Sequence, residues 1–451
     1  MTKCDKNARF TCDWIFNILV VLSDGKVVCG CADPYGKRPL GNLNKNSLYE
    51  IWYSDKVKQI RRELNQGHSC FCHDCGLKRV LRDDEDIPQN HEHMETLSRI
   101  FLEPTVRCNL KCFKAVCRPD SGILKSRERQ NFPVQQFKTL MDEIGSKLIR
   151  LDFFNYGEPF VHPQAVDMIE YIKEKYPHIY LYCSTNGLML NREKIKRIIQ
   201  SGLDEITFSV DGCDQESYVR YRQGGDFEAV LNLISIFVEE RNKLGREVPF
   251  INWRYILFNW NDSKRMMKRA KKLALKIGVD RFSWEITDHP PGAKSEKYQV
   301  GTSYWKKIYY EIWDTSQIGN AIKKKRFFAQ LKIMNPLIFT MVSGEPMESN
   351  VRIKNIGGAL WLKTAWSGRR WVRLGAQLHD QDKKMIDLNY ARAFLNRDIN
   401  YREKDILTIM LPAINEPGDY YLKFDMVSEG NDWFENGGSP VIWVPLRVCP
   451  A

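Results

Sequence analysis

The placement of the cysteines constrains this chain more than any other feature of its sequence. Ten of the 13 cysteines fall before residue 120, and three of these lie in the ten-residue stretch CNLKCFKAVC, Cys108 to Cys117. The first residues lack the apolar core of a signal peptide, and no run approaches the roughly 18 apolar residues of a membrane helix, so we expect a soluble cytoplasmic protein. Reducing cytosol argues against a disulfide framework. The pattern therefore predicts metal or iron–sulfur ligation, with Cys183, Cys213 and Cys449 as buried thiols.

The net charge of +12 does not identify a partner. Basic surfaces attract nucleic acids, but here Lys and Arg are spread along the chain and interleaved with acidic residues, as in KIKRIIQSGLDE. The one dense basic run, KKKRF at residues 323–327, has the same interpretation. We expect a solvated basic surface, no specific nucleic acid partner and no membrane.

The length of 451 residues exceeds what one hydrophobic core usually supports, so two or three domains are expected. Composition divides the chain into a cysteine-rich domain at 1–82, an acidic and polar linker at 83–98, an alternating α/β block at 99–290, a connecting segment at 291–345 and a β-rich block at 346–451.

The α/β block alternates short apolar strands with amphipathic helices. The predicted strands are at 100–107, 147–155, 179–185, 205–210, 251–258 and 280–286, and the predicted helices at 134–145, 163–176, 191–202, 227–245 and 263–278. Strands joined by helical crossovers form a parallel sheet. The strand count alone leaves an open doubly wound fold and an incomplete barrel as alternatives.

The last block contains β-rich runs separated by turn signals such as NEPGD and ENGGSP, which is typical of an all-β sandwich. These runs are at 350–355, 359–366, 371–378, 405–412, 420–427 and 440–448.

Cys108, Cys112 and Cys117 follow the first predicted strand of the α/β block. Ligand sites in parallel α/β folds gather at the carboxyl ends of strands, so a cofactor is expected at this loop. Three thiolates can hold three irons of a cubane and leave the fourth open, whereas a structural zinc ion would need a fourth ligand close by.

The segment EPTVRCNLKCFKAVC resembles the cluster loop of the radical S-adenosylmethionine (SAM) enzymes, whose usual pattern is Cys-x3-Cys-x2-Cys. The later strand ends agree in order: NYGEP is similar to the family segment that meets the methionyl amine, STNG follows, and FSVDG resembles the segment near the SAM ribose and carboxylate. The resemblance implies a partial (β/α)6 radical SAM barrel with a SAM-binding 4Fe–4S cluster. The implied SAM contacts are Asn155, Gly157, Glu158, Ser184, Asn186, Ser209 and Asp211.

The chain departs from the family at the third cysteine. The usual spacing places this ligand at Ala115, and the next thiol is Cys117. A loop two residues longer can still reach a cubane corner, so we predict Cys117 as the ligand. The alternatives are a degenerate barrel that has lost its cluster and a cluster with an incomplete thiolate set.

Several of the other residues also have purely structural interpretations. Glu158 is otherwise a turn carboxylate beside Pro159, and Ser209 and Asp211 are otherwise caps of the next helix. Arg254 and Asn259, on the fifth strand, either approach SAM or substrate or have no functional role.

The N-terminal cysteines form a second group of possible metal ligands. TCDWIF, DGKVVCGC, LGNLNKNSLYEIWYS and the closing CHDC resemble the SPASM domain, an auxiliary iron–sulfur module that usually follows the barrel and here precedes it. The resemblance implies an auxiliary 4Fe–4S cluster bound by Cys12, by Cys29 or Cys31, and by Cys72 and Cys75. A zinc ribbon is the alternative, since CHDC alone fits zinc as well as iron.

The C-terminal block carries Trp361, Trp366, Trp371, Trp433 and Trp443. Its ending weakly resembles terminal β-sandwiches of polysaccharide-export and glycan-modifying proteins, which implies stacking on sugar rings. The alternative is burial in the sandwich core.

Together these features predict a radical SAM oxidoreductase, or a related radical-based modifying enzyme, that acts on a small molecule, glycan, nucleotide-sugar or peptide and receives electrons from a reductase such as flavodoxin or ferredoxin. No catalytic acid or base can be named from the sequence. The competing hypotheses are a non-catalytic iron–sulfur electron-transfer protein on a degenerate barrel and a zinc-stabilised carbohydrate-binding protein.

Overall fold

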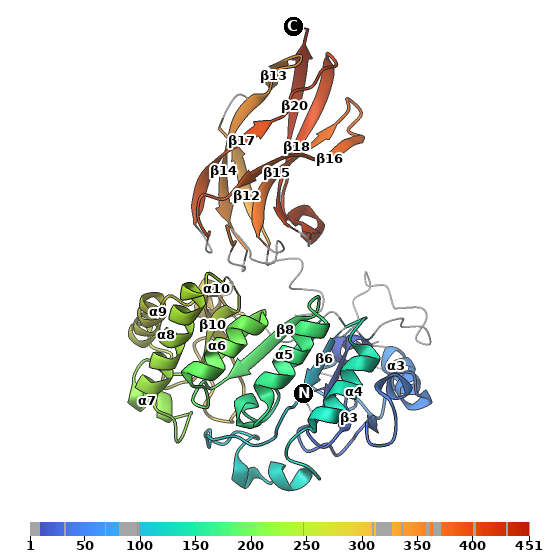
Figure 1. Ribbon diagram of the computed structural model, residues 1–451. Coiled ribbons are helices and arrows are strands. Elements are labelled where there is room, and N and C mark those ends of the chain that lie inside the picture. Colours follow the sequence, from blue (N-terminus) through green and yellow to red (C-terminus); the bar gives the residue numbers. More distant parts are fainter. Residues whose placement is uncertain are drawn as a thin grey trace. The chain divides into compact units, whose positions relative to one another are not determined.

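The computed structural model describes residues 10–30, 33–67, 69–80, 97, 99–148, 150–246, 248–308, 311–312, 327–334, 338–357, 361–363, 371–399, 403–429 and 432–450. The chain divides into two compact units, Met1–Ile308 and Tyr309–Ala451, and each is described by itself (Figure 1). Within the described ranges, none of the helices has the length and apolar character needed to cross a membrane.

The first unit is built on one nine-stranded sheet with the order β11-β10-β9-β8-β7-β6-β2-β3-β4. Its six barrel strands are all parallel: β6 (Arg99–Leu102), β7 (Arg150–Phe153), β8 (Tyr180–Thr185), β9 (Glu205–Ser209), β10 (Phe250–Leu257) and β11 (Arg281–Ile286). Their spatial order follows the sequence without reversal, whereas a doubly wound sheet reverses at a switch point. The partial barrel is therefore confirmed and the open doubly wound alternative is wrong.

Five longer helices connect these strands and pack on one another in sequence order (Figure 1). They are α4 (Val134–Ile144), α5 (Ala165–Lys175), α6 (Arg192–Ser201), α8 (Phe227–Lys243) and α9 (Lys264–Ile277). The unit also holds the short helices α7 (Gln215–Val219) and α10 (Ser303–Ile308) and the 3-10 turns η1 (Pro119–Ser121), η2 (Ile123–Ser126) and η3 (Pro159–Val161). Each predicted barrel strand and long helix is present, with bounds that differ by a few residues.

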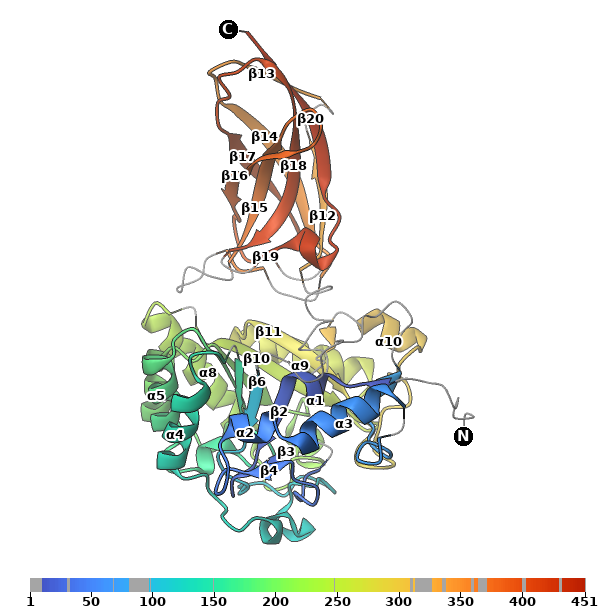
Figure 2. The same ribbon diagram turned by 90° about the vertical axis from the view of Figure 1, so that its right-hand side faces the viewer.

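The cysteine-rich segment continues the barrel sheet. Its elements are β1 (Phe10–Thr11), α1 (Asp13–Asn17), β2 (Ile18–Val21), β3 (Lys26–Val28), β4 (Gly41–Asn42), α2 (Leu48–Trp52), α3 (Asp55–Asn65) and β5 (Arg79–Val80). Strand β2 is fully buried and pairs in parallel with β6, with Val21 opposite Leu102 (Figure 2). The segment therefore adds a seventh parallel strand beside the strand that leads into Cys108. Of the predicted linker at 83–98, only Leu97 lies among the described residues.

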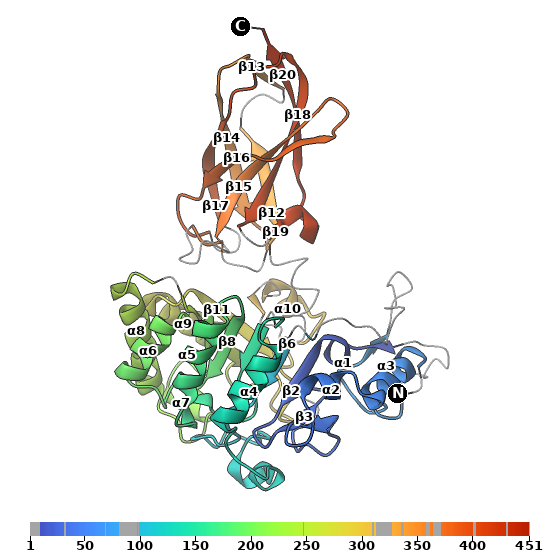
Figure 3. The same cartoon turned by 45° about the vertical axis from the view of Figure 1, so that its right-hand side comes forward.

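The second unit contains two β-sheets around one apolar core, as predicted for a sandwich (Figure 3). Its elements are β12 (Ala329–Ile333), β13 (Phe339–Val342), β14 (Met347–Asn355), β15 (Val372–His379), β16 (Met385–Phe394), β17 (Lys404–Leu411), β18 (Gly418–Ser428), β19 (Asp432–Trp433), the 3-10 turn η5 (Phe434–Gly437) and β20 (Ile442–Cys449). The pairs within the sheets are antiparallel except β13 with β20. Trp361 is fully buried in this core, and Trp366 and the basic run 323–326 lie outside the described residues.

Candidate functional site

The loop that carries Cys108, Cys112 and Cys117 is fixed to the segment that follows α7. The Lys111 backbone N–H donates to the Gln223 carbonyl over 3.0 Å, and the Phe113 N–H donates to the Tyr221 carbonyl over 2.7 Å. These bonds connect the carboxyl end of β6 with that of β9, because α7 follows β9. The loop is thus held over the edge of the sheet where ligands bind in parallel folds.

The two extra residues of the loop are absorbed in a turn. Lys114 has a φ of 48°, in the left-handed region, and the Ala115 N–H donates to the Cys112 carbonyl. This turn returns the chain so that the Cys117 and Cys112 thiols interact with each other. The unusual spacing therefore still brings Cys117 to Cys112.

The sulfur of Cys112 lies in a cationic environment. The hydrogen bond from Cys117 lowers the pKa of Cys112 to about 6, and the Arg222 guanidinium, whose Nη1 lies 3.8 Å from the sulfur, acts in the same direction. Burial raises the pKa of Cys108 to about 12. The thiolate is the form of cysteine that binds metal, and the Arg222 guanidinium favours it at Cys112.

Glu158 is buried at the carboxyl end of β7. Its carboxylate accepts hydrogen bonds from the Thr185 hydroxyl at 2.6 Å and from the Asn186 N–H at 2.7 Å, both at the end of β8. It also accepts a longer hydrogen bond from the Phe160 N–H, at 3.4 Å, and so caps the turn η3 as well. Burial raises the pKa of Glu158 to about 7.

The glycine before Glu158 is required by close backbone packing. A Cβ on Gly157 would lie 2.0 Å from the Thr105 carbonyl oxygen, and the Glu158 N–H donates to the Arg107 carbonyl over 2.9 Å. Asn155, earlier in the same segment, is half-buried. The NYGEP segment is thereby packed directly against the strand end that leads into Cys108.

Asn186 connects the third strand end to the thiol loop. Its Nδ2 donates to Asn109 Oδ1 over 2.9 Å and lies 3.9 Å from the Cys108 sulfur, a weak contact. The predicted site residues on β6, β7 and β8 are therefore brought together.

Ser209 and Asp211 are not caps of the next helix, because the N-cap of α7 is Asp214. The Ser209 hydroxyl lies 3.4 Å from that of Ser184 and accepts a hydrogen bond from Arg254 Nη2 at 2.6 Å. Asp211 is fully buried and accepts from Arg222 Nε at 2.6 Å.

Arg222 was missed in the sequence. It bonds Asp211 with one edge of its guanidinium and approaches Cys112 with the other, so it joins two predicted site residues. The only hint in the sequence was the position of Arg222 in the segment YRQGG after the fourth strand. This segment matches no motif of defined spacing. Asn261, which donates to the Asp211 carbonyl over 3.0 Å, was missed for the same reason.

A groove of about 560 Å³ adjoins the thiol loop at the ends of β10 and β11. The Phe113 and Trp260 rings meet edge to face at 6.2 Å, and the Asn259 side chain donates to the Gly292 carbonyl. The groove is lined by Phe113, Lys114, Arg220, Gln223, Asn259, Trp260, Pro291, Gly292 and Ala293.

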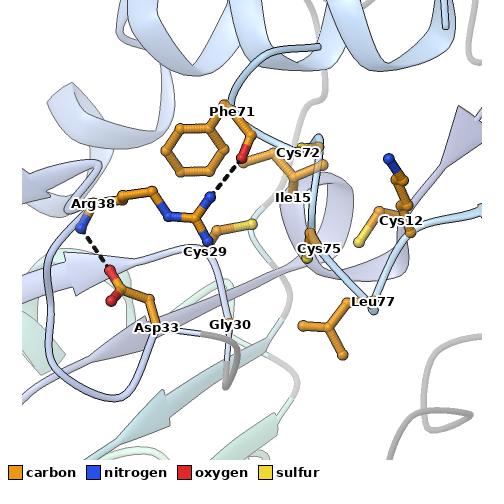
Figure 4. A pocket seen from close by; sticks show the side chains of 11 residues that line it. Cys12, Ile15, Cys29, Gly30, Asp33, Arg38, Phe71, Cys72, Cys75 and Leu77 are labelled. Atoms are coloured by element: carbon orange, nitrogen blue, oxygen red, sulfur yellow. Dashed lines mark hydrogen bonds between the residues drawn. The ribbon is translucent and has the colours of Figure 1, made fainter. Parts of the chain in front are cut away.

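Four N-terminal thiols line a second pocket. Cys12 precedes α1, Cys29 follows β3, and Cys72 and Cys75 lie in the loop after α3; Figure 4 shows them around one space, beside Arg38 and Leu77. Burial raises the pKa values of Cys12, to about 11, and of Cys29 and Cys72. The alternative ligand Cys31 lies outside the described residues, and Cys70, the other cysteine of the loop after α3, is exposed.

A zinc ribbon and an iron–sulfur cluster place different demands on these four thiols. Among residues 10–30, 33–67 and 69–80, no three Cys, His, Asp or Glu side chains are placed to hold a metal ion. A structural zinc ion needs four ligands around one point, whereas the thiolates of an iron–sulfur cluster bind separate irons around a larger object. The thiols spread around the pocket are therefore compatible with a cluster.

The parallel half-barrel presents three cysteines, a buried glutamate and an ordered set of polar strand ends at its carboxyl edge, which is the arrangement of a cluster-binding domain. Comparison with known families identifies the two domains. Residues 102–247 match the Radical SAM superfamily and residues 12–76 match the SPASM iron–sulfur cluster-binding domain. The barrel is therefore a radical SAM domain, and the cysteine-rich segment ahead of it is a SPASM domain. The cofactors of these domains are a 4Fe–4S cluster with SAM, and an auxiliary iron–sulfur cluster.

Several curated proteins are similar to this chain over part of its length. The tungsten-containing aldehyde ferredoxin oxidoreductase cofactor-modifying protein of Pyrococcus furiosus is 28% identical over 190 residues, which are 40% of this chain and 49% of that protein. The Fe-coproporphyrin III synthase of Methanosarcina barkeri is 30% identical over 174 residues, 37% of this chain and 41% of that protein. The chain thus spans about half, or less, of the length of these relatives. Among solved structures, Streptococcus suis SuiB bound to S-adenosylmethionine aligns with a TM-score of 0.36 at 15% identity, over 44% of this chain and 42% of SuiB.

Proposed function

We propose that this protein is a radical SAM enzyme that cleaves SAM reductively and removes a hydrogen atom from an organic substrate. When bound, the 4Fe–4S cluster supplies the electron that releases a 5'-deoxyadenosyl radical from SAM. The observation that carries the proposal is the gathering of residues from four successive strand ends around Cys108, Cys112 and Glu158.

Cys108, Cys112 and Cys117 are the proposed thiolate ligands. The hydrogen bond between Cys117 and Cys112 and the nearby Arg222 favour the thiolate of Cys112. Three ligands would leave one iron open for SAM.

Glu158 is proposed to hold the methionyl amine of SAM. Glu158 is 3% exposed, and the Phe160 N–H, Thr185 hydroxyl and Asn186 N–H that donate to its carboxylate are neutral. A buried carboxylate is stabilised by an opposite charge, and an ammonium group supplies one. Gly157 and Asn186 would shape the surroundings of this carboxylate.

The remaining parts of SAM have partners at the next two strand ends. Ser184, Ser209 and Arg254 present hydroxyl and guanidinium donors that suit the carboxylate and ribose, and Asp211 fixes Arg222 below them. The groove with Phe113 and Trp260 begins one residue after Cys112 and would take the adenosyl part between aromatic and polar walls.

Cys12, Cys29, Cys72 and Cys75 are the proposed ligands of an auxiliary 4Fe–4S cluster. Four thiolates saturate such a cluster, which suits electron transfer and structure rather than substrate binding. The substrate is proposed to be a sugar, nucleotide-sugar or peptide, and the electron donor a flavodoxin or ferredoxin.

The test is anaerobic reconstitution with iron and sulfide, reduction with dithionite, addition of SAM and assay of 5'-deoxyadenosine. About eight irons per chain together with 5'-deoxyadenosine support the proposal. If the wild-type protein binds iron but does not cleave SAM, even after candidate substrates are added, it would be an electron-transfer protein. Zinc without iron would indicate a zinc protein.

Cys117 is tested by moving the thiol. We expect Cys117→Ala to lose the SAM-binding cluster, and Ala115→Cys in the same chain to restore part of it by supplying the usual spacing. Cys70→Ala, which removes an exposed thiol, is the matched control and should keep both clusters. Full activity of Cys117→Ala alone would contradict this assignment.

A further inference from the structure

Arg61 of α3 is a buried cation that the proposed function does not use. The residue is 1% exposed. Its Nε donates to the Ile15 carbonyl over 3.0 Å and its Nη1 to the Trp52 carbonyl over 3.4 Å, and its Cζ lies 4.0 Å from the centre of the Trp52 ring. Its Nη2 has no hydrogen-bond partner within the described structure. The guanidinium is therefore enclosed among neutral groups.

Other buried arginines of the first unit are paired with carboxylates, such as Arg99 with Asp152 and Arg127 with Glu103. Within residues 10–30, 33–67 and 69–80 and the other described ranges of this unit, Arg61 forms no such pair. Carbonyl groups and an indole ring solvate a cation but do not neutralise it, and a buried charge without a counter-charge is destabilising. A negative charge is therefore expected close to Arg61 when the cofactors of the protein are bound.

Arg61 reaches the wall of the pocket of four thiols. Ile15 accepts the hydrogen bond from Arg61 through its carbonyl, and it lines the pocket together with Cys29 (Figure 4). Burial lowers the pKa of Arg61 to about 10, and a negative charge on Cys29 acts in the opposite direction. Burial and the neighbouring thiols raise the pKa of Cys29, and Arg61 acts against them. The guanidinium thus stays charged at neutral pH and acts electrostatically on the thiol pocket.

The same arginine holds helix α1, whose backbone contacts another of the thiols. The Trp14 and Ile15 N–H groups donate hydrogen bonds to the Cys12 sulfur, which act against burial, the effect that raises the pKa of Cys12 to about 11. Helix α1 has only 5 residues, and isolated helices of that length are not stable in water. The bond from Arg61 to the Ile15 carbonyl ties α1 to α3, so it keeps these two donors in place.

We propose that Arg61 provides the counter-charge of the auxiliary cluster and makes the reduction potential of this cluster less negative. The inference rests on the proposed auxiliary 4Fe–4S cluster. When a one-electron donor such as dithionite reduces the cluster, the cluster gains one negative charge and no bond is broken. Net charge and hydrogen bonds to the sulfurs set the potential of such clusters. The Arg61 charge stabilises the additional electron directly, and the N–H donors that Arg61 holds act in the same direction.

The test is a redox titration of the full chain with both clusters reconstituted, followed by electron paramagnetic resonance. The signal that changes when SAM is added belongs to the SAM-binding cluster, and the other signal to the auxiliary cluster. We expect Arg61→Gln, which removes the charge, to lower the ratio of reduced to oxidised auxiliary cluster at a fixed potential about tenfold, which is about 59 mV for a one-electron couple. The SAM-binding cluster should keep its wild-type potential.

Two further variants separate the charge from the packing. Arg61→Lys keeps the charge but not the planar group that bonds two carbonyls, and its auxiliary potential should lie closer to that of the wild type than to that of Arg61→Gln. Arg62→Gln removes the same charge from the exposed neighbouring position and should leave both potentials unchanged, because solvent screens that charge. If Arg61→Gln does not fold, Arg61→Lys decides: a potential like that of the wild type supports the inference, and a tenfold shift overturns it.

An unchanged or less negative auxiliary potential in a folded Arg61→Gln variant that holds about eight irons would overturn the inference and leave the proposed function intact. Equal shifts in Arg61→Gln and Arg61→Lys would show that the charge is not the cause, and would also overturn it. A wild type that holds only about four irons would instead contradict the auxiliary cluster itself, and this inference with it.

Discussion

Arg222 is the residue whose single side chain joins most of the candidate SAM site. Its Nε donates to Asp211 Oδ2 over 2.6 Å, with the carboxylate fully buried, and its Nη1 approaches Cys112. Removing one partner of a buried ion pair leaves an uncompensated charge, which is more destabilising than the loss of a surface pair. Arg222 therefore couples the stability of the β9 strand end to the thiol loop.

We predict that Arg222→Met lowers the free energy of unfolding by about 3–5 kcal/mol and abolishes SAM binding. Urea unfolding and equilibrium dialysis with SAM measure the two effects. The control Arg197→Met, at an exposed pair with Glu170, should change stability by about 0–1 kcal/mol. In the double variant with Asp211→Asn, part of the loss should be recovered, and strict additivity would contradict the proposed coupling.

Gly157 tests the packing of the NYGEP segment. A Cβ there would lie 2.0 Å from one backbone oxygen and 2.8 Å from another, and backbone atoms cannot move aside as a side chain end can. We predict that Gly157→Ala destabilises the protein by at least about 2 kcal/mol and displaces Glu158. Gly418→Ala, where the nearest atom is a Tyr420 ring carbon at 3.4 Å, should be close to neutral. Thermal unfolding of the two variants gives the comparison, and equal melting temperatures would refute it.

At the scale of elements, helix α2 of the SPASM domain is capped by the barrel. The Leu48 and Tyr49 N–H groups donate to the Glu143 carboxylate of α4, at 3.1 and 2.7 Å. The helix also has its own capping box between Ser47 and Glu50. The free backbone N–H groups in the first turn of α2 are thus bonded partly by the capping box and partly by a helix about 95 residues away in the sequence.

We predict that Glu143→Ala raises hydrogen exchange in residues 48–65 by an amount corresponding to about 1–2 kcal/mol. The exposed neighbour Asp142, which bonds Lys175 and Tyr171 instead, supplies the control Asp142→Ala. Hydrogen exchange in residues 48–65 should be unchanged in the Asp142→Ala variant. A response to Asp142→Ala as large as that to Glu143→Ala would mean that the cap is not the cause.

The elements differ in how far the sequence predicts them. The six barrel strands and five long helices were predictable because most of the strands are buried on both faces and each helix has one apolar stripe. Strands β12 and β13 were missed and lie within the predicted connecting segment 291–345. Strand β16 was missed because its first half, Met385–Asn389, is exposed throughout and shows no alternation. The pairing of β2 with β6 was not predictable either, since strand partners depend on docking and not on local pattern.

The candidate site was predictable to a similar extent. Strand-end motifs pointed to Glu158, Asn186 and Asp211 because each motif lies within a few residues of sequence. Arg222 and Asn261 were missed because their roles arise only when distant segments meet. The return of the Cys117 loop depends on the left-handed Lys114, which no spacing rule predicts.

At the scale of the first unit, the two thiol groups lie at opposite edges of one sheet. Cys108 follows the carboxyl end of β6, whereas Cys29 follows β3, which runs antiparallel to β2 and therefore ends at the amino edge. The parallel pairing of β2 with β6 fixes this relation, since Ile18 lies opposite Arg99. Sites separated by the length of a strand share no ligand, so each can be removed without the other.

We accordingly predict that Cys72→Ala with Cys75→Ala removes about four irons and leaves the SAM-binding cluster, and that Cys112→Ala removes the other four and leaves the auxiliary cluster. Iron analysis gives the counts. Electron paramagnetic resonance of the reduced protein, with and without SAM, identifies which cluster remains, because only the cluster with an open iron changes its spectrum when SAM binds. The first variant should still respond to SAM and the second should not. Loss of all iron in either variant would show that the clusters form cooperatively, and would contradict the independence that the sheet geometry implies.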